Sequence, residues 1–318
     1  MGLRTHGMDC EREDQLIAFC FPGQGSLEQG MGREIAEAVP EAMEVFTVGT
    51  DASGLDLKHL CFEAPIDELV RTDVQQPALV ATSLAVLAAL RARGIAPDYV
   101  VGHSVGEFAA IAAANSIDTG AAIGLVRERG IAMAEAARES DGTMAAILGL
   151  DDAVVEELCS EIEGVWPANY NCPGQIVVSG EEAAVERLIS RASQLGAART
   201  VRLKVSGAFH SPLVAKAAER LKPAVDKVRF ADPVAPFMST VTAKIEPAQR
   251  MAGLLVEQVT APVKFTQAAH GLVKEGAKTF VEVGPGNVLS GLVKRIDRGV
   301  RTVSVNNLAG LKKVEETV

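Results

Sequence analysis

The sequence has few cysteines, few aromatic residues and no long apolar run. Its five cysteines are scattered over 318 residues, without a C-x-x-C pair or a cluster of cysteine and histidine. We therefore expect a reducing, cytoplasmic compartment and no metal site. Aromatic residues make up only 4% of the chain, and no apolar run reaches the roughly 20 residues of a membrane helix. We expect a protein whose core needs no disulfide and that does not enter a membrane.

Basic residues are outnumbered by acidic ones. Lysine and arginine total 31 against 41 aspartate and glutamate residues, so the net charge is −10, which argues against nucleic acid as a partner. Hydrophobic residues make up 48% of the chain, and their richness in alanine, valine and leucine fits an α/β protein. Residues 1–14 mix arginine with acidic side chains, so we interpret them as a flexible extension rather than a transit peptide.

The hydrophobic pattern predicts short buried strands that alternate with helices. In the main body, strands are expected at residues 15–21, 99–102, 233–238, 278–283 and 301–305. Helices are expected at residues 32–47, 56–70, 75–93, 121–138 and 213–228. Asn306 and Asn307 are expected to begin the C-terminal tail. This alternation favours an open α/β sheet.

Between residues 140 and 205 the composition changes. Strand-like and helical stretches follow one another there in the order β-α-β-β-α-β, which is the ferredoxin-like pattern. No linker rich in proline or serine separates this segment from its neighbours. We therefore predict a small packed subdomain at 140–205, inserted into a larger domain made of residues 15–139 and 206–318.

The strongest chemical signal is the sequence G-H-S-V-G at residues 102–106, between a predicted strand and a predicted helix. Glycines on both sides of Ser104 allow a sharp turn and leave room for neighbouring backbone. The N-terminus of the following helix would stabilise an oxyanion formed beside the hydroxyl. The alternative is a glycine-rich turn with an incidental serine, but the flanking strand and helix favour a nucleophile.

A nucleophilic serine needs a base, and His210 is the best candidate among the five histidines. It lies in a loop between glycine and proline where the chain re-enters the larger domain. His103 adjoins Ser104, but neighbouring side chains on a tight turn point apart. Gln24, in a glycine-rich loop after the first strand, could donate to an oxyanion or could bridge loop backbone. Both alternatives stay open at this point.

Two arginines of one predicted helix, Arg127 and Arg129, lie two residues apart and therefore face different sides. One could line a cavity while the other contacts solvent. A solvated position is the ordinary alternative for either arginine.

Several motifs occur in one order along the chain: F-P-G-Q-G-S (21–26), G-H-S-V-G-E (102–107), R-G (129–130), N-Y-N-C-P-G-Q (169–175), G-A-F-H-S (207–211) and E-V-G-P-G (282–286). With them the chain resembles the malonyl-CoA:acyl-carrier-protein transacylases from about residue 16 to about residue 307. The resemblance is more distant to the acyltransferase domains of polyketide and animal fatty-acid synthases. It implies an α/β-hydrolase-like core with a parallel sheet and the inserted subdomain.

The resemblance also implies a role for each matching residue. Ser104 would be the nucleophile and His210 its base, oriented by the main-chain carbonyl of Gln258. Gln24 and the backbone N–H of Val105 would form the oxyanion hole. Arg129 would bind the malonyl carboxylate, and Phe209 would narrow the acyl site.

The implied reaction moves a malonyl group from malonyl-CoA to acyl carrier protein without a cofactor. The sequence leaves the oligomeric state open, and we expect a monomer. Fatty-acid synthesis is the expected setting, and a trans-acting polyketide acyltransferase is the alternative. A serine thioesterase or hydrolase, and a non-catalytic synthase module, are the rival classes. Since the carrier is expected to be acidic, a basic docking surface is predicted at Arg199, Arg202, Lys204, Lys294 and Arg295, with ordinary solvated charge as the alternative.

Overall fold

The computed structural model describes residues 16–318, and the extension predicted at residues 1–14 lies outside the described residues. The larger of two sheets has six strands in the order β10-β9-β1-β2-β7-β8. All neighbours are parallel except β7 and β8, which are antiparallel. The strands are β1 (Ile17–Phe21), β2 (Tyr99–Gly102), β7 (Phe237–Ser239), β8 (Lys244–Glu246), β9 (Thr279–Val283) and β10 (Arg301–Val305). The predicted α/β core with a parallel sheet is confirmed.

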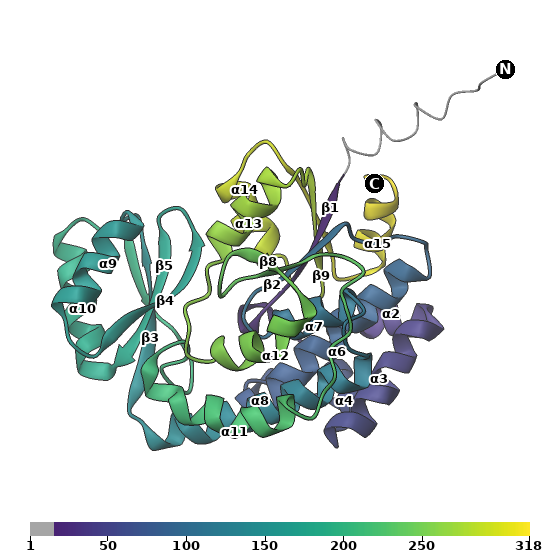
Figure 1. Cartoon of the computed structure of the whole chain (residues 1–318), viewed down its shortest axis with the longest axis horizontal. Coiled ribbons are helices and arrows are strands. Elements are labelled where there is room, and N and C mark those ends of the chain that lie inside the picture. The colour runs from purple at the N-terminus through teal and green to yellow at the C-terminus, as the bar shows by residue number, and fades with distance from the viewer. Residues whose placement is uncertain (1–15) are drawn as a thin grey trace.

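Helices cover both faces of this sheet (Figure 1). Alternate residues of β1 point to opposite faces: Ala18 and Cys20 belong to the apolar cluster with α13 and α14, and Phe19 and Phe21 to the cluster with α6, α7 and α8. Burial on both faces explains why the strands read as continuous apolar runs. The helices named are α6 (Thr72–Arg91), α7 (Gly106–Ala113), α8 (Thr119–Glu139), α13 (Phe265–Lys274) and α14 (Val288–Ile296).

Helix α6 is long and apolar enough to cross a membrane by length and composition, but 89% of its most apolar window is buried inside the protein. It packs against α8 and α3 (Pro40–Ser53), as a core helix of a globular domain does. The helix begins at Thr72, three residues before the predicted start at residue 75, and Pro77 lies inside it. Because Pro77 has no N–H, the Asp73 carbonyl lacks its helical donor. The Arg127 guanidinium donates to that carbonyl instead, so a proline is accommodated inside the helix.

Other sequence predictions of elements are corrected by the structure. Each of the two predicted helices at 32–47 and 56–70 is divided, because Pro40 and Pro65 interrupt the hydrogen bonding. Strand β8, helix α12 (Ala248–Glu257) and helix α15 (Leu308–Glu315) were not predicted. The expected tail after Asn307 is wrong: the Asn307 side chain accepts from Gly310 N at 2.8 Å and caps α15. The first predicted helix is divided into α2 (Arg33–Ala38) and α3 (Pro40–Ser53), and the second into α4 (Leu57–Phe62) and α5 (Ile66–Leu69). The helix predicted at 213–228 is α11 (Ala215–Val225).

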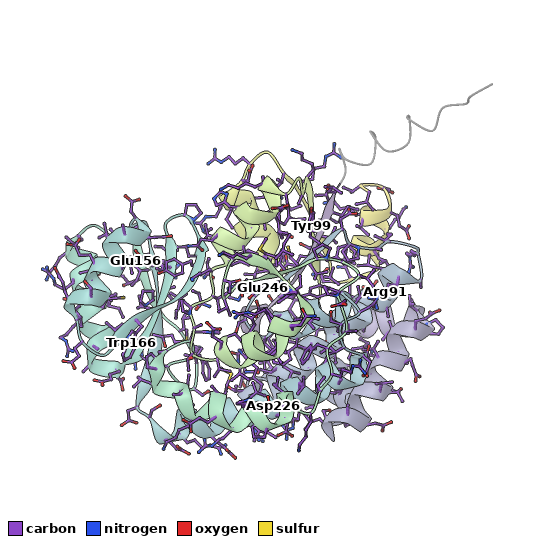
Figure 2. All side chains as sticks on the ribbon, viewed as in Figure 1. Arg91, Tyr99, Glu156, Trp166, Asp226 and Glu246 are labelled. Atoms are coloured by element: carbon purple, nitrogen blue, oxygen red, sulfur yellow. The ribbon has the colours of Figure 1, made fainter. Side chains whose placement is uncertain are left out.

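The second sheet is antiparallel, with its strands in the order β4-β5-β3-β6. It forms the lobe at the left of Figure 1 with α9 and α10, and Figure 2 labels Glu156 and Trp166 within it. Its helices and strands share an apolar cluster separate from those of the larger sheet. The elements are β3 (Gly142–Leu148), α9 (Asp152–Glu161), β4 (Val165–Cys172), β5 (Gln175–Glu181), α10 (Glu182–Gln194) and β6 (Arg199–Arg202), in β-α-β-β-α-β order.

Strand β4 joins this lobe to the larger domain. Val263, in the loop before α13, donates to Ala168 O and accepts from Tyr170 N, each at 2.8 Å. The Thr266 hydroxyl donates to Tyr170 O at 3.1 Å. The two sheets are therefore held together by backbone hydrogen bonds beside the cavity described next.

Candidate active site

The turn between β2 and α7 places Ser104 at the end of the larger sheet. Ser104 has φ 53°, a left-handed conformation that is uncommon for residues other than glycine. A Cβ on Gly102 would lie 2.2 Å from Glu107 N, and one on Gly106 would lie 2.1 Å from Phe21 O. Only glycine fits at both positions, so the two glycines make this strand-to-helix turn possible.

His210 faces Ser104 across the site. Its Nε2 lies 2.8 Å from Ser104 Oγ, and its Nδ1 lies 2.9 Å from Gln258 O and 3.1 Å from Ala261 O. Because both carbonyls can only accept, the ring proton must be on Nδ1. The Nε2 nitrogen is then unprotonated, and its lone pair faces the Ser104 hydroxyl. Burial, together with the charge of Arg129, lowers the pKa of His210 to about 3. The imidazole is therefore neutral and able to accept a proton at neutral pH.

Arg129 approaches the same hydroxyl from α8 and is fully buried. Its Nη2 donates to Ser104 Oγ at 3.2 Å and to Gln258 Oε1 at 3.0 Å, and its Nη1 donates to Gln76 Oε1 at 2.7 Å. Its Nε is buried without an acceptor among residues 16–318. Burial lowers the pKa of Arg129 to about 10, so the guanidinium stays charged at neutral pH. Arg127 points elsewhere, to Asp73.

The two groups predicted for an oxyanion lie beside Ser104. Val105 is the N-cap of α7, and within residues 16–318 neither its N–H nor that of Gln24 donates to another backbone carbonyl. The Gln24 side-chain Nε2 donates to Gln75 Oε1 at 2.9 Å. One N–H of the side-chain amide is thus engaged by Gln75, and the second N–H and the backbone N–H of Gln24 are the donors that an oxyanion could use.

A cavity of about 370 Å³ opens over the reacting pair, between the two sheets. The larger domain contributes Ser104, His210, Gln24 and Phe209 to its lining, and Phe209 is buried beside His210. The lobe of the second sheet and the segment that follows it contribute mostly apolar and amide side chains, namely Met144, Asn169, Asn171, Gln175, Val177 and Leu203.

His103 connects the turn to the second lobe. Its Nε2 lies 2.9 Å from Asn171 Oδ1 on β4, and burial lowers its pKa. It therefore pairs with Asn171 instead of Ser104, which agrees with its exclusion as the base. In residues 16–318 there is no group of three or more His, Cys, Asp or Glu side chains able to hold a metal ion.

Glu107 is the last residue of the G-H-S-V-G-E motif, but no function was predicted for it from the sequence. The Glu107 carboxylate is fully buried and accepts from Thr240 N at 2.6 Å, Thr240 Oγ1 at 3.0 Å and Gln258 Nε2 at 2.7 Å. Burial raises its pKa to about 7, while these donors and the charge of Arg129 lower it. The sequence offered one signal for a role of Glu107: an acidic residue stands at the start of an otherwise apolar helix, directly after the serine turn.

The predicted basic docking surface is changed by the structure. Arg202 pairs with Glu182 and, at 3.1 Å, with Glu186, so much of its charge is offset. Arg295 donates to Gln175 Oε1 at 2.8 Å. Lys204 lines the cavity, and Arg199 and Lys294 are exposed.

Known proteins are similar to this chain over almost its whole length. The family model of the acyl transferase domain matches residues 18–317. The malonyl CoA-acyl carrier protein transacylase of Bacillus subtilis (strain 168) is 43% identical over 296 residues, which cover 92% of this chain and 93% of that protein. The transacylase of the same name from Staphylococcus aureus (strain MRSA252) is 37% identical, with 93% of this chain and 97% of that protein covered.

Solved structures are similar in fold as well. The malonyl-CoA:acyl carrier protein transacylase from Xanthomonas oryzae has a TM-score of 0.92 and 38% identity, covering 95% of this chain and 98% of that chain. A malonyl-transacylase in complex with its type II polyketide synthase acyl-carrier protein has a TM-score of 0.92 and 37% identity, covering 96% of this chain and 100% of that chain. The chain therefore belongs to the acyl transferase domain family and, within it, to the malonyl-CoA:acyl-carrier-protein transacylases that its motifs resemble.

Proposed function

We propose that this protein transfers the malonyl group of malonyl-CoA to the phosphopantetheine thiol of acyl carrier protein, through a malonyl ester on Ser104. One observation carries the proposal: a neutral imidazole nitrogen and a buried guanidinium both lie within 3.2 Å of the same hydroxyl oxygen, Ser104 Oγ. The imidazole suits a base for the hydroxyl, and the guanidinium suits an acyl group that carries a carboxylate.

In the first half-reaction His210 Nε2 takes the Ser104 proton while Oγ attacks the thioester carbonyl. The Nδ1 proton stays on the carbonyls of Gln258 and Ala261, which stabilise the imidazolium. The N–H groups of Val105 and Gln24 receive the oxyanion of the tetrahedral intermediate; a single such donor is typically worth about 3 kcal/mol of the barrier. Collapse breaks the C–S bond, and CoA leaves with the proton from His210.

The second half-reaction reverses these steps with another thiol. His210 takes the proton of the phosphopantetheine thiol, the sulfur attacks the ester carbonyl, and Ser104 leaves with its proton restored. Both donor and product are thioesters of the same kind of thiol, so the transfer is reversible. No cofactor takes part, and malonyl-CoA is a substrate.

Arg129 accounts for the choice of a malonyl group. A planar guanidinium binds a carboxylate by two parallel hydrogen bonds. The buried Nε without an acceptor is a donor that such a carboxylate can satisfy. An acetyl group would leave the buried arginine without this partner, and sites of this kind reject analogues that lack the bonding group. Phe209 narrows the space around the malonyl α-carbon.

The partner is an acyl carrier protein, and we propose that it belongs to fatty-acid synthesis. The alternative is a polyketide carrier, which one structurally similar transacylase binds. The basic docking surface is proposed at Arg199, Lys204, Lys294 and Arg295. The charge of Arg202 is offset by Glu182 and Glu186, whereas Arg295 donates to a neutral amide and keeps its charge.

We also propose the division of the chain into a catalytic domain (15–139 and 206–318) and an inserted subdomain (140–205), which the separate apolar cluster of the lobe supports. A monomer in the cytoplasm is the proposed form, because one chain supplies every group of the site. Nucleic acid and membranes are not proposed as partners.

Intact-mass measurement tests the function directly. Mixed with malonyl-CoA, the protein should gain the mass of one malonyl group, and the added mass should pass to carrier protein on mixing. A serine hydrolase would instead release CoA over many turnovers with malonyl-CoA alone. A protein that gains no malonyl mass would refute the proposal and favour a non-catalytic module.

A further inference from the structure

We propose that Glu107 is a positioning residue, whose carboxylate holds the Gln258 amide in the one orientation that supports Arg129 beside Ser104. The inference rests on the proposed function, because it concerns how the malonyl carboxylate is selected. It adds a buried residue behind the groups that touch the substrate.

Gln258 contacts the site twice. Its main-chain carbonyl accepts from His210 Nδ1 at 2.9 Å, and its side-chain Oε1 accepts from Arg129 Nη2 at 3.0 Å. One residue after α12 therefore orients both the base and the guanidinium. The main-chain contact depends on the path of the backbone, whereas the side-chain contact depends on which way the amide is turned.

The partners of the amide determine its orientation. Arginine can only donate and a carboxylate can only accept, so the amide must present Oε1 to Arg129 and Nε2 to Glu107. Gln258 Nε2 lies 2.7 Å from Glu107 Oε2. If the amide were turned over, a donor would face the guanidinium and an acceptor would face the carboxylate. Glu107 is the group that makes this arrangement the stable one.

Glu107 is itself held firmly. Its Oε1 accepts from Thr240 N, from Thr240 Oγ1 and, at 3.3 Å, from the hydroxyl of Ser239. Both carboxylate oxygens therefore face donors, which is the pattern of an ionised carboxylate. Because Arg129 is also fully buried, the two opposite charges share one unexposed region with Gln258 between them, and each reduces the cost of burying the other.

The substitution Glu107→Gln tests the inference with little change of shape. The Thr240 donors require an oxygen at Oε1, so the new amide nitrogen would face Gln258 Nε2. Two donors then meet, the Gln258 amide turns over, and Arg129 loses its acceptor. We expect the ratio of malonyl to acetyl loading on Ser104, measured by intact mass after brief mixing with each acyl-CoA, to fall about 30-fold or more.

A second readout separates positioning from general damage. Ser104 should still react with phenylmethylsulfonyl fluoride at a rate within about threefold of the unchanged protein, because the main-chain carbonyl of Gln258 still orients His210. Equal losses of both loading rates and of this reactivity would show general damage and would overturn the inference. Glu107→Asp, which keeps the charge and shortens the reach, is the second variant should Glu107→Gln not fold, and it should lower the ratio in the same direction.

A double-mutant cycle asks whether Glu107 acts through the amide. In Gln258→Leu the amide is absent and the main-chain carbonyl remains, so adding Glu107→Gln should change the ratio by less than about threefold. An undiminished effect of Glu107→Gln in that background would overturn the inference.

Glu282 provides the matched control. It is also buried and accepts from Leu289 N and Ser290 N at 2.9 and 2.8 Å, away from Arg129. Glu282→Gln should lower the thermal midpoint and leave the ratio unchanged. Failure of the unchanged protein to gain malonyl mass would refute the proposed function itself, whereas an unchanged ratio in Glu107→Gln with normal malonyl loading would refute only this inference.

Discussion

The two walls of the cavity differ in kind. The wall formed by the larger domain carries the Ser104 hydroxyl and the His210 imidazole, and the fully buried Arg129 guanidinium donates to that hydroxyl. Hydrogen bonds of 2.7–3.2 Å hold these three groups. The wall formed by the second lobe carries methionine, valine, leucine and side-chain amides. Asn171 Oδ1 of this lobe accepts a hydrogen bond from His103 Nε2 of the serine turn.

This difference indicates that the two walls have different functions. Reactive and charged groups must be held within a few tenths of an ångström, and the larger domain does so with main-chain carbonyls and a buried acid. Apolar and amide groups need only enclose the acyl chain and exclude water, which a separate lobe can do. Changes on the first wall should therefore affect chemistry, and changes on the second should affect fit.

The largest effect is expected from Ser104→Ala. Without the hydroxyl no malonyl ester can form, and the transfer rate should fall about 10⁴-fold or more. Intact mass after mixing with malonyl-CoA measures the ester, and a carrier-loading assay measures the rate. The control is Ser206→Ala, which removes a hydroxyl at the cavity lining that contacts only Thr72 at 3.0 Å; it should cost less than about fivefold. Malonyl mass on the Ser104→Ala protein would contradict the assignment.

Arg129→Ala should have the next largest effect. Loss of a buried two-point contact to a carboxylate should reduce malonyl transfer about 100- to 1000-fold, with a much smaller loss for acetyl-CoA. Arg127→Ala is the matched control, since Arg127 contacts Asp73 rather than Ser104. It should affect stability and leave the malonyl preference intact. Equal losses for both acyl groups in Arg129→Ala would refute carboxylate binding.

A third prediction concerns how the stability of the protein depends on pH through His210. Since the folded state lowers the pKa of His210 to about 3, only the unfolded chain binds a proton there between about pH 6.5 and pH 3. Stability is therefore lost as the pH falls through this window, by up to about 1 kcal/mol per pH unit. His210→Asn, which tolerates the φ of 59°, removes this contribution.

Denaturant unfolding at several pH values measures the effect. The difference in unfolding free energy between the unchanged protein and His210→Asn should shift in favour of the variant as the pH falls from 7 to 4. Parallel curves over that range would mean that the imidazole is not buried in its neutral form.

The smallest effect is expected on the second wall, from Asn171→Ala. This change removes the hydrogen bond to His103 and costs about 1 kcal/mol, or roughly fivefold, in malonyl transfer. The malonyl preference over acetyl should not change, because Arg129 is untouched. Asn169→Ala, on the same strand and lining the same cavity, provides the comparison. A loss as large as that of Arg129→Ala would show that the second lobe takes part in the chemistry.

Much of the fold was predictable because its elements are marked locally. The strand–turn–helix around Ser104, the β-α-β-β-α-β order of the second lobe and the strands of the larger sheet other than β8 follow from apolar runs and turn residues. Helix α6 begins three residues earlier than predicted, and the Asp73 carbonyl that Pro77 leaves without a helical donor accepts from Arg127 of α8. Helix α15 was missed because its start depends on the Asn307 cap rather than on a long apolar pattern.

The sequence by itself determined the turn at Ser104, since a side chain at Gly102 would overlap the backbone of Gly106 and Glu107 2.2 Å away, and such a requirement is visible in a few adjacent residues. The resemblance implied Arg129 and the Gln258 carbonyl, but only the tertiary structure gave their contacts with Ser104 and His210 and the position of Glu107 behind them. These contacts join residues 25 to 151 positions apart. Their geometry depends on how separate helices pack against the sheet, which no local pattern encodes.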